Sequence, residues 1–338
     1  MLEIPLLLVF IIVIALVFDY TNGAHDAANA IATIVSTKVL SPLTAVTMAA
    51  MLNLFGAFLG TKVAETIGGG IVSPDMVMGC RTLILAALMG AILWNVATWV
   101  WGIPSSSSHA LIGGLMGAAV AHGGWGVLHY QSIVEKVILP LFLSPFVGFI
   151  AGFVLMRLLA RTFANAHPRT ANRMFRRLQI GSSAFMAVSH GMNDAQKTMG
   201  IIALALVIFQ QIPEFHVPFW VRLMCSSAMF LGTLTGGWKI IKTMGHKIFK
   251  IEPVHGFAAE TSAAMVIVAA SSIGAPISTT HVISTSVIGV GASKRLSAVR
   301  WGVAGRLLVA WVVTIPAAAC VGALSFAAVE IVRKLFGG

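Results

Sequence analysis

Charged residues are scarce in this sequence. Only 10% of the 338 residues are charged, whereas 58% are hydrophobic, and the mean hydropathy is +0.92. Because soluble domains carry roughly 25% charged residues, this composition excludes an ordinary soluble protein and indicates a polytopic membrane protein. The apolar runs are continuous and do not alternate in polarity, so we expect all-α spans and not the strands of a barrel.

Cysteine and acidic residues are also few. The three cysteines share no metal-ligand spacing, so we expect core thiols at Cys80, Cys225 and Cys320, without a disulfide framework, a metal site or a cofactor. Eleven acidic residues against 22 basic ones give a net charge of +11. In a soluble protein this excess would indicate nucleic acid. In a membrane protein basic residues set the orientation of the spans, so we expect no nucleic-acid partner.

Long apolar segments follow one another along the chain, and several exceed the length of about 20 residues that one straight span needs. They lie near residues 4–37, 42–60, 82–121, 132–156, 180–209, 219–237, 257–293 and 302–330. Glycine, proline or polar residues interrupt the segments 4–37, 82–121, 180–209 and 257–293. We therefore expect broken helices there, a feature of transporter binding sites.

Basic residues gather in three loops, at 157–177, 239–250 and 294–300. The positive-inside rule places all three on the cytoplasmic side. This requires segment 257–293 to enter and leave the membrane on the same side, as a re-entrant hairpin. It also requires each element of the first half of the chain to cross the membrane in the direction opposite to its counterpart in the second half. We therefore expect two inverted-topology repeats, residues 1–156 and 180–338, joined by a basic cytoplasmic linker at 157–179, with the N-terminus outside.

The polar stretch DYTNGAHDAAN at residues 19–29 interrupts the first apolar segment, and the related stretch SHGMNDAQK at 189–197 interrupts a later one. Asp26 and Asp194 correspond in the two stretches. Ionisable groups at membrane depth are costly, so they need partners, water or a bound ion. Because amides flank both aspartates, we expect this pair to bind a cation or carry a proton. The alternative is a buried structural hydrogen-bond network.

A second motif also occurs twice, as GIPSSSSH at residues 102–109 and GAPISTTH at 274–281. Gly-x-Pro breaks a helix, and the hydroxyl run that follows predicts a new helix start. The free backbone N–H groups and positive dipole end of such a start suit a tetrahedral oxyanion. The alternative is that the hydroxyls only cap a kinked helix or bond across helices. For His109 and His281, a packing role and a ligand role both stay open.

The charges of the two aspartate motifs limit the mechanism. Asp26 and Asp194 contribute −2 and Lys197 contributes +1, so an arriving anion is repelled at low dielectric unless a positive charge comes with it. Either the carboxylates bind protons or cations bind beside them, and both are forms of symport. Lys197 could pair an aspartate, contact the anion or replace a cation. The roles of Asp19 and Glu260, which could lie nearer an interface, stay open.

At these residues the chain resembles the inorganic phosphate transporter family often called PiT, over nearly its whole length. The resemblance rests on NGAHDAANAIAT, HGMNDAQKTMG, PSSSSH and PISTTH. It implies a secondary transporter in the inner membrane of a bacterium, which moves inorganic phosphate with a cation. It also implies two inverted repeats whose helical hairpins meet at a central site. Bacterial low-affinity members are associated with metal-phosphate complexes as substrates, and a homodimer stays open.

The motifs and the resemblance together define the expected site. We expect phosphate to be bound by Ser106, Ser107, Ser108, Ser278, Thr279, Thr280, Asn29, Asn193 and Lys197, and the cation to be coupled through Asp26, Asp194, Asn22, His25 and Gln196. The family's usual motif, Asn-Asp-x-x-Asn, differs here at His25 and Lys197. Sodium-coupled members keep both asparagines, whereas bacterial members with the His-Asp and Gln-Lys forms look proton-coupled. Because a fixed ammonium at Lys197 repels a neighbouring sodium ion, we favour protons over sodium.

Other functions compete with proton-coupled phosphate import. A sodium-coupled symporter stays open, as does a sulfate permease of the same fold, although sulfate has no proton to donate to the aspartates at neutral pH. A passive anion channel would not need two intramembrane carboxylates beside an anion site. A hydrolase triad of Ser108, His109 and Asp26 fails, because no nucleophile elbow is present and adjacent Ser and His need not face each other. We therefore expect a transporter and not an enzyme.

Overall fold

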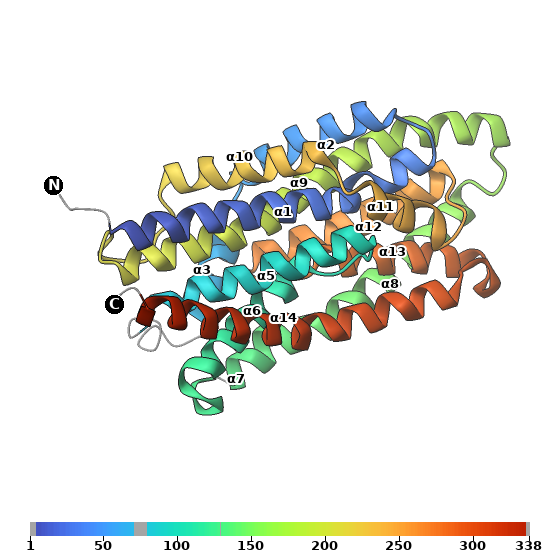
Figure 1. Cartoon of the computed structure of the whole chain (residues 1–338). Helices are drawn as coiled ribbons and strands as arrows, with labels where there is room; N and C mark the ends of the chain where they lie inside the picture. The colour runs from blue at the N-terminus through green and yellow to red at the C-terminus, as the bar shows by residue number, and fades with distance from the viewer. Residues whose placement is uncertain (1–4, 71–79, 129, 336–338) are drawn as a thin grey trace.

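The structure is a computed structural model that describes residues 5–70, 80–128 and 130–335. These residues form helices and no strands (Figure 1). The helices are α1 (Leu6–Ser36), α2 (Pro42–Gly56), α3 (Lys62–Gly70), α5 (Thr82–Trp101), α6 (Ser107–Gly123), α7 (Tyr130–Ile133), α8 (Leu139–Thr162), α9 (Pro168–Ile208), α10 (Phe219–Thr235), α11 (Trp238–Lys242), α12 (Pro253–Ser272), α13 (Thr279–Lys294) and α14 (Trp301–Leu335), with short 3-10 or π turns η1 (Trp125–Val127), η2 (Val134–Ile138), η3 (Thr243–Lys247) and η4 (Leu296–Ala298). Within these ranges, α1, α5, residues 142–162 of α8, α12 and α14 are long and apolar enough to cross a membrane. The prediction of an all-α, multi-pass membrane protein is confirmed.

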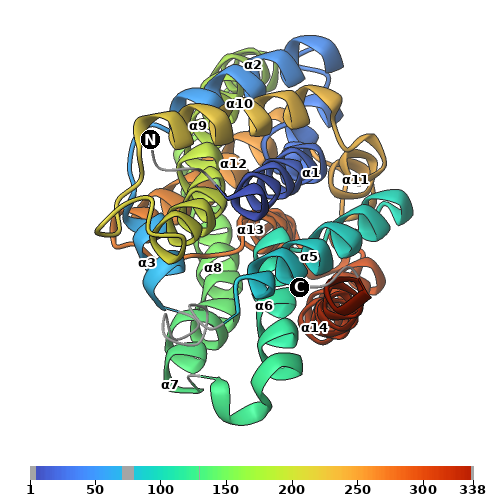
Figure 2. The ribbon, with the colours of Figure 1, turned by 60° about the vertical axis from the view of Figure 1, so that its left-hand side comes forward.

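Helix α1 lies inside the bundle, between α10, α9 and α5 (Figure 2). In its first half only every third or fourth residue is buried, which is the pattern of a helix with one face outward. From Thr21 to Ile34 every residue is buried, because neighbouring helices surround that half. Helix α9 is buried in the same way from Asn193 to Leu206. The aspartate motifs therefore lie in the protein interior.

The polar stretches at 19–29 and 189–197 do not break their helices. Helices α1 and α9 each run without interruption through them, so the prediction of broken helices at these two places is wrong. The polar side chains find partners on other helices and leave the backbone hydrogen bonds of their own helix intact. The glycines allow close packing instead: a Cβ atom at Gly191 would lie 2.1 Å from the backbone oxygen of Asn53 on α2.

Helix interruptions occur at the two hydroxyl motifs. Helices α5 and α6 are separated at Gly102, whose φ of +68° is readily accessible to glycine. Ser106 then caps α6, because its hydroxyl accepts a hydrogen bond from the backbone N of His109 at 3.3 Å. Gly274 and the cap residue Ser278 repeat this arrangement between α12 and α13. The prediction that these hydroxyl runs start helices is confirmed.

Two clusters of buried apolar residues lie on either side of the aspartate motifs. Along α1, buried residues between 8 and 18 belong to one cluster and those between 28 and 34 to the other. Along α9 the order is reversed, with Met186 and Ala187 in the second cluster and buried residues from 195 to 208 in the first. The aspartates and their partners therefore form a polar layer between two apolar layers.

Helices from the first half of the chain pack on helices from the second half. Helix α8 packs along α13 and α12, and α14 packs along α6 and α5. In the same way α1 packs on α10, and α9 packs on α2. Each helix of the first half corresponds to one of the second half: α1 to α9, α2 to α10, α5 to α12, α6 to α13, and α8 to α14. When every helix is replaced by its counterpart, each of these contacts becomes another one of them; for example, α8 on α13 becomes α14 on α6. Figure 1 shows α1 and α9, and likewise α8 and α14, running in opposite directions.

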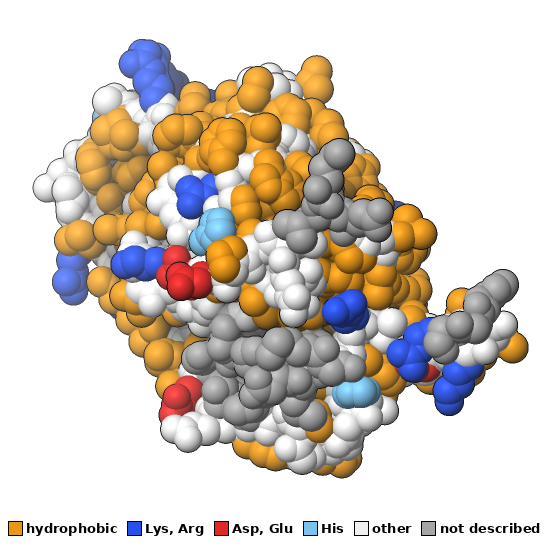
Figure 3. Space-filling model, turned by 90° about the vertical axis from the view of Figure 1, so that its left-hand side faces the viewer, with side chains coloured by type: hydrophobic (Ala, Val, Ile, Leu, Met, Phe, Trp, Pro, Cys, Tyr) orange, Lys and Arg blue, Asp and Glu red, His pale blue; other side chains and the backbone are white. Residues whose placement is uncertain are grey.

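The start of α1 and the end of α14 lie at the same end of the molecule (Figure 1). The turn between α8 and α9, helix α11 and the turn between α13 and α14 lie at the other end, so the three basic segments of the sequence share that end. Most of the basic segment 157–179 is helical, and only residues 163–167 separate α8 from α9. Figure 3 looks onto the first end, where lysine or arginine side chains and acidic ones are scattered among hydrophobic and other side chains.

Some details of the fold differ from the sequence-based expectations. The short helices α3, α7 and α11 were not expected, because each is too short to show a periodic apolar pattern. Cys80 and Cys225 are buried as expected. Cys320 is exposed, so the prediction of a core thiol is wrong there. Cys320 lies on α14, much of which faces outward, because an apolar residue in a membrane span need not face the protein core.

Candidate functional site

Four helices bring most of the predicted site residues together in the polar layer. Helices α1 and α9 contribute the aspartate motifs, and the starts of α6 and α13 contribute the hydroxyl motifs. The amide Nδ2 of Asn29 donates to Oγ1 of Thr279 at 3.2 Å and to Oγ1 of Thr280 at 3.0 Å. All three side chains are buried. The first aspartate motif thus contacts the second hydroxyl motif, about 250 residues later in the chain.

Asp26 joins both hydroxyl motifs to α1. Its carboxylate accepts hydrogen bonds from Oγ1 of Thr280 at 3.3 Å and from Oγ of Ser107 at 3.5 Å. The neighbouring His25 contacts it through Nδ1 at 2.7 Å, while Nε2 of the same ring faces Thr98 at 3.2 Å and Ser105 at 3.3 Å. Both ring nitrogens are engaged, so the orientation of His25 against the carboxylate is held from both sides.

Lys197 forms an ion pair inside the site. Its Nζ lies 2.5 Å from Oδ1 of Asp194, and the Lys197 side chain is only 2% exposed. The same ammonium donates to Oγ of Ser108 at 2.5 Å and to the backbone oxygen of Ile277 at 3.2 Å. The other oxygen of Asp194 accepts a hydrogen bond from Thr279 at 3.1 Å. Among the roles left open for Lys197, the structure shows the pairing with an aspartate.

The site combines an anion-binding geometry with a negative charge. The first backbone N–H groups of α6 and α13 have no acceptor within their own helices, and both helix starts carry the positive dipole end. Hydroxyls of Ser107, Ser108, Thr279 and Thr280 stand at these starts. With neutral histidines, Asp26, Asp194 and Lys197 give a net charge of −1. A tetrahedral anion finds donors here, but it needs an accompanying positive charge.

His190 belongs to the site, although the sequence analysis did not single it out. Its Nε2 lies 3.3 Å from Oδ2 of Asp194, one helical turn away on α9. One ligand atom each from Asp26, His190 and Asp194 lies within 4.8 Å of the others, which is compact enough for one cation. The i, i+4 spacing of His190 and Asp194 is the signal that would have found it.

Asn193 and Gln196 form their hydrogen bonds outside this cluster. The amide of Asn193 donates to Oγ of Ser271 on α12 at 2.8 Å. Oε1 of Gln196 accepts from the backbone N of Val63 on α3 at 2.9 Å, so Gln196 ties α3 to α9. Asn22 is buried on α1, and its Oδ1 has no hydrogen-bond partner among the residues that the structure describes. Ser106 and Ser278 serve as helix caps at the edge of the cluster.

His109 and His281 pack against each other directly behind the hydroxyl motifs. Their ring centroids are 4.8 Å apart, and His281 also stacks on Trp311 at 4.0 Å. Both rings are buried, and within the described ranges Nδ1 of each lacks a hydrogen-bond partner. The structure therefore shows packing for both histidines, without the hydrogen bonds that usually accompany a buried ring.

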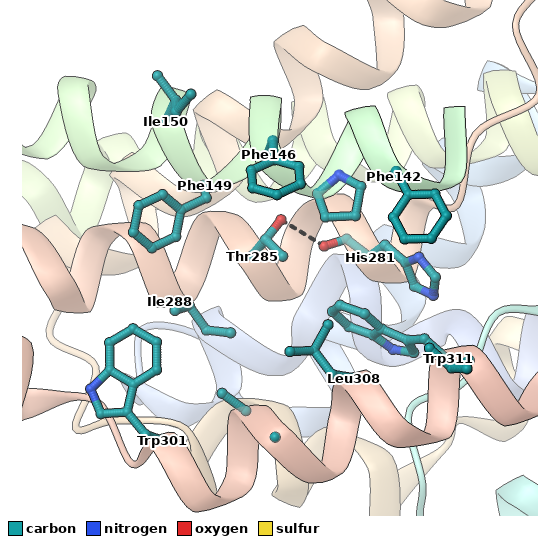
Figure 4. Close-up of a pocket in the computed structure, with 14 residues that line it drawn as sticks. Phe142, Phe146, Phe149, Ile150, His281, Thr285, Ile288, Trp301, Leu308 and Trp311 are labelled. Carbon is teal, nitrogen blue, oxygen red and sulfur yellow. Dashed lines mark hydrogen bonds between the residues drawn. The ribbon is translucent and has the colours of Figure 1, made fainter. Parts of the chain in front are cut away.

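An apolar cavity of about 810 Å³ lies beside this histidine pair, between α8, α13 and α14 (Figure 4). Its wall is mostly aromatic and aliphatic, and Phe146 and Trp311 are examples. Its polar members are His281 and Thr285, whose hydroxyl donates to the backbone oxygen of His281 at 2.8 Å. The described residues that line it include no charged side chain, so this cavity does not suit phosphate.

Glu260 and Asp19, whose roles the sequence left open, lie inside the protein. Both are fully buried. The carboxylate of Glu260 on α12 accepts hydrogen bonds from the hydroxyls of Thr33 and Ser182. It lies away from the aspartate motifs, in the half of α12 nearer the basic end of the molecule.

A buried ion pair and two sets of hydroxyls, enclosed between apolar layers of a membrane-helix bundle, define a membrane transporter. The chain belongs to the phosphate transporter family, whose model matches residues 22–322. The resemblance to the phosphate transporters of the PiT type is thereby confirmed. Members of this family move phosphate across membranes, so the expectation of a transporter and not an enzyme is confirmed as well.

Similar proteins cover nearly the whole chain. A protein of Rhizobium meliloti (strain 1021) is 51% identical over 96% of this chain and 97% of its own length, and one of Bacillus subtilis (strain 168) is 48% identical over 95% and 96%. Each is described as "Probable low-affinity inorganic phosphate transporter". A solved structure described as "The sodium-dependent phosphate transporter" matches 96% of this chain with a TM-score of 0.86 and 24% identity, and 99% of that chain is covered. At this identity the likeness supports the fold alone.

Proposed function

We propose that this chain imports inorganic phosphate by proton symport. The observation that carries the proposal is the position of the Lys197 ammonium, 2.5 Å from both Asp194 and Ser108. A fixed cation stands between a carboxylate and a hydroxyl motif, where a sodium-coupled mechanism would place a mobile one. Two like charges at close range and low effective dielectric repel strongly, which disfavours a sodium ion beside Lys197.

In this proposal Asp194 is paired with Lys197, so Asp26 is the remaining carboxylate of the site and takes the proton. Lys197 neutralises Asp194, and protonation of Asp26 removes the remaining negative charge, so that an anion can enter. Phosphate keeps a proton at neutral pH and can donate it in a hydrogen bond to an aspartate, whereas sulfate cannot. The carboxylates therefore favour phosphate over sulfate as the substrate.

In this proposal the starts of α6 and α13 bind the phosphate. Their unpaired backbone N–H groups point toward the polar layer, and hydroxyls of Ser107, Ser108, Thr279 and Thr280 surround it. Asn29 already bonds two of these hydroxyls and holds them in position. Phosphate would replace the contacts that the hydroxyls now make with the carboxylates.

The exchanged helix contacts support an inverted repeat of residues 1–156 and 180–338. In this architecture α5–α6 and α12–α13 are re-entrant hairpins that enter from opposite sides of the membrane and meet at the polar layer. The three basic segments share one end of the molecule, and we place that end in the cytoplasm of a bacterium. The start of α1 and the end of α14 then lie outside the inner membrane.

A metal-phosphate complex is a second candidate substrate, because Asp26, His190 and Asp194 converge there. Its metal would have to overcome the same repulsion from Lys197 that disfavours sodium. Carboxylate oxygens and an imidazole nitrogen are ligands that divalent metals accept. Uptake of labelled phosphate with magnesium present, compared with uptake in excess EDTA, separates the two substrates. Uptake that requires magnesium identifies the complex, and uptake that survives EDTA identifies free phosphate.

Ion replacement in proteoliposomes tests the coupling ion. We expect an imposed pH gradient, acidic outside, to drive accumulation of labelled phosphate in sodium-free buffer, because Asp26 takes its proton from the outer solution. A protonophore should stop accumulation, whereas flux through a passive channel would continue. The solved relative is described as sodium-dependent, so sodium is the main alternative. A strict sodium requirement would overturn the proposal.

A further inference from the structure

Asp19 is a buried carboxyl group that the proposed transport site does not use. It lies on α1 seven residues before Asp26, and therefore about 10 Å nearer the start of the helix and on the same helix face. Its side chain is completely enclosed, with an exposure of 0%. No hydrogen-bond donor in the described part of the chain bonds either carboxyl oxygen.

Two further unpartnered oxygens border this carboxyl group. Asn22 lies one turn farther along α1 and Thr198 lies on α9, and both side chains face Asp19. Oδ1 of Asn22 and Oγ1 of Thr198 are themselves buried, and neither has a hydrogen-bond partner in the part of the chain that the structure describes. By distance and angle these four polar oxygens form no hydrogen bond with one another, although Asn22 and Thr198 lie close enough to act as donors to the carboxyl group, whereas buried polar groups are normally paired. An ionised carboxylate is costly in such a place, so a positive charge or a proton is needed there.

The charged and titratable neighbours of Asp19 do not supply that positive charge. Asp194 and Lys197 face it from α9, but they are bonded to each other at 2.5 Å, so their effects on Asp19 oppose each other. From α10 the thiol of Cys225 faces it and brings no positive charge. Among the described residues, Asp19 has no ion-pair partner of its own.

A single proton completes the hydrogen bonds of this cluster. A protonated Asp19 has one O–H, which Oδ1 of Asn22, an acceptor only, can receive. The carbonyl oxygen of the acid can then accept the hydroxyl proton of Thr198. With one proton added, Asp19, Asn22 and Thr198 all take part in hydrogen bonds, and no charge is buried.

We infer that Asp19, Asn22 and Thr198 form a second proton-binding site, which carries one proton per transport cycle in addition to the proton at Asp26. The inference rests on the proposed proton symport. The site lies on the α1 side of the polar layer, toward the end of the molecule where α1 begins. It loads as phosphate binds and empties when the carrier opens to the other side, so that phosphate entry is coupled to two protons.

Asp19→Asn tests the second site, because asparagine keeps the shape of the protonated acid but cannot release a proton. In proteoliposomes with a pH difference of about one unit, each coupled proton raises the limiting phosphate concentration ratio about tenfold. We expect the variant to reach a ratio about tenfold lower than the wild-type protein and a proton-to-phosphate stoichiometry lower by one. Exchange of labelled external phosphate for internal phosphate moves no net proton, so exchange should be retained.

Two further measurements separate a proton site from a structural role. Asp19→Glu keeps a titratable carboxyl and should restore the lost proton. Thr198→Val removes the donor to the acid carbonyl, so the infrared C=O stretch that Asp19→Asn abolishes should shift in this variant. An unshifted band, an unchanged stoichiometry in Asp19→Asn, or a parallel loss of exchange and accumulation would each overturn the inference.

The wild-type protein distinguishes this inference from the function on which it rests. If a pH gradient does not drive phosphate uptake by the wild-type chain, the proposed symport itself is wrong. If it does, and Asp19→Asn couples the same number of protons, only the second proton site is wrong.

Discussion

Replacing Lys197 with methionine is expected to abolish phosphate uptake and to destabilise the folded protein by about 3–5 kcal/mol. Asp194 would remain fully buried after losing the ammonium that lies 2.5 Å away. Methionine is close in length to the lysine stem, so the loss reflects an uncompensated charge and not a cavity. Ser108 would lose its ammonium contact as well.

The double variant Lys197→Met, Asp194→Asn separates stability from transport. Removing both charges together leaves no isolated ion, and replacing a buried pair with neutral groups is often close to neutral for stability. We therefore expect the double variant to recover most of the lost stability without recovering uptake. Asp194→Asn alone should abolish uptake too, because it leaves the ammonium unpaired.

Thermal unfolding in detergent and uptake into proteoliposomes measure the two effects. Lys242→Met is a matched control, because Lys242 is exposed on α11 and its replacement should change stability by no more than about 0.5 kcal/mol. A Lys197→Met protein as stable as the wild type would show that Asp194 is already neutral in the resting protein. The fixed ion pair would then not exist, and the argument against sodium would lose its basis.

Replacing Asp26 with asparagine is expected to lower the limiting phosphate concentration ratio by at least about tenfold under a pH difference of about one unit, while the protein still folds. Asparagine keeps an oxygen that can accept from Thr280 or Ser107, and their hydroxyls can rotate to meet it. It cannot bind and release a proton, so the first step of coupling is lost. The expected change in stability is small. Among the described ion-pair contacts of Asp26, only the one with the His25 ring is lost, and that ring is charged only when it is protonated.

Accumulation under an imposed pH gradient, with unfolding as a check on integrity, measures this effect. Glu135→Gln is the control, because it removes an exposed carboxylate from η2, far along the chain from both motifs. This control should accumulate phosphate like the wild type. A limiting ratio in Asp26→Asn equal to that of the wild type would remove Asp26 from the coupling mechanism.

The meeting of the motifs could be predicted because their chemistry is local. Gly-x-Pro followed by hydroxyls determines where one helix ends and the next begins, whatever surrounds it, and α6 and α13 start there. Polar groups in an apolar chain must find each other, because lipid offers them no partners. The bonds from Asn29 to Thr279 and Thr280 satisfy that requirement.

Features that depend on neighbours in space could not be predicted. Whether a polar stretch breaks α1 or α9 depends on whether other helices offer partners, and here they do. The partner of Gln196 is the backbone of α3, a helix too short to recognise in the sequence. The expected break in α9 also hid His190, because its spacing from Asp194 has meaning only on a continuous helix.

The packing of α8 on α13 and of α14 on α6 has a consequence for folding. Neither half of the chain can complete its own core, since the last long helix of each half covers a hairpin of the other half. Helices α5 and α6 are made early, yet they stay uncovered until α14 has been synthesised and inserted. We therefore expect the chain to unfold as one cooperative unit, and a chain separated at residues 163–167 to give two fragments that are each incomplete.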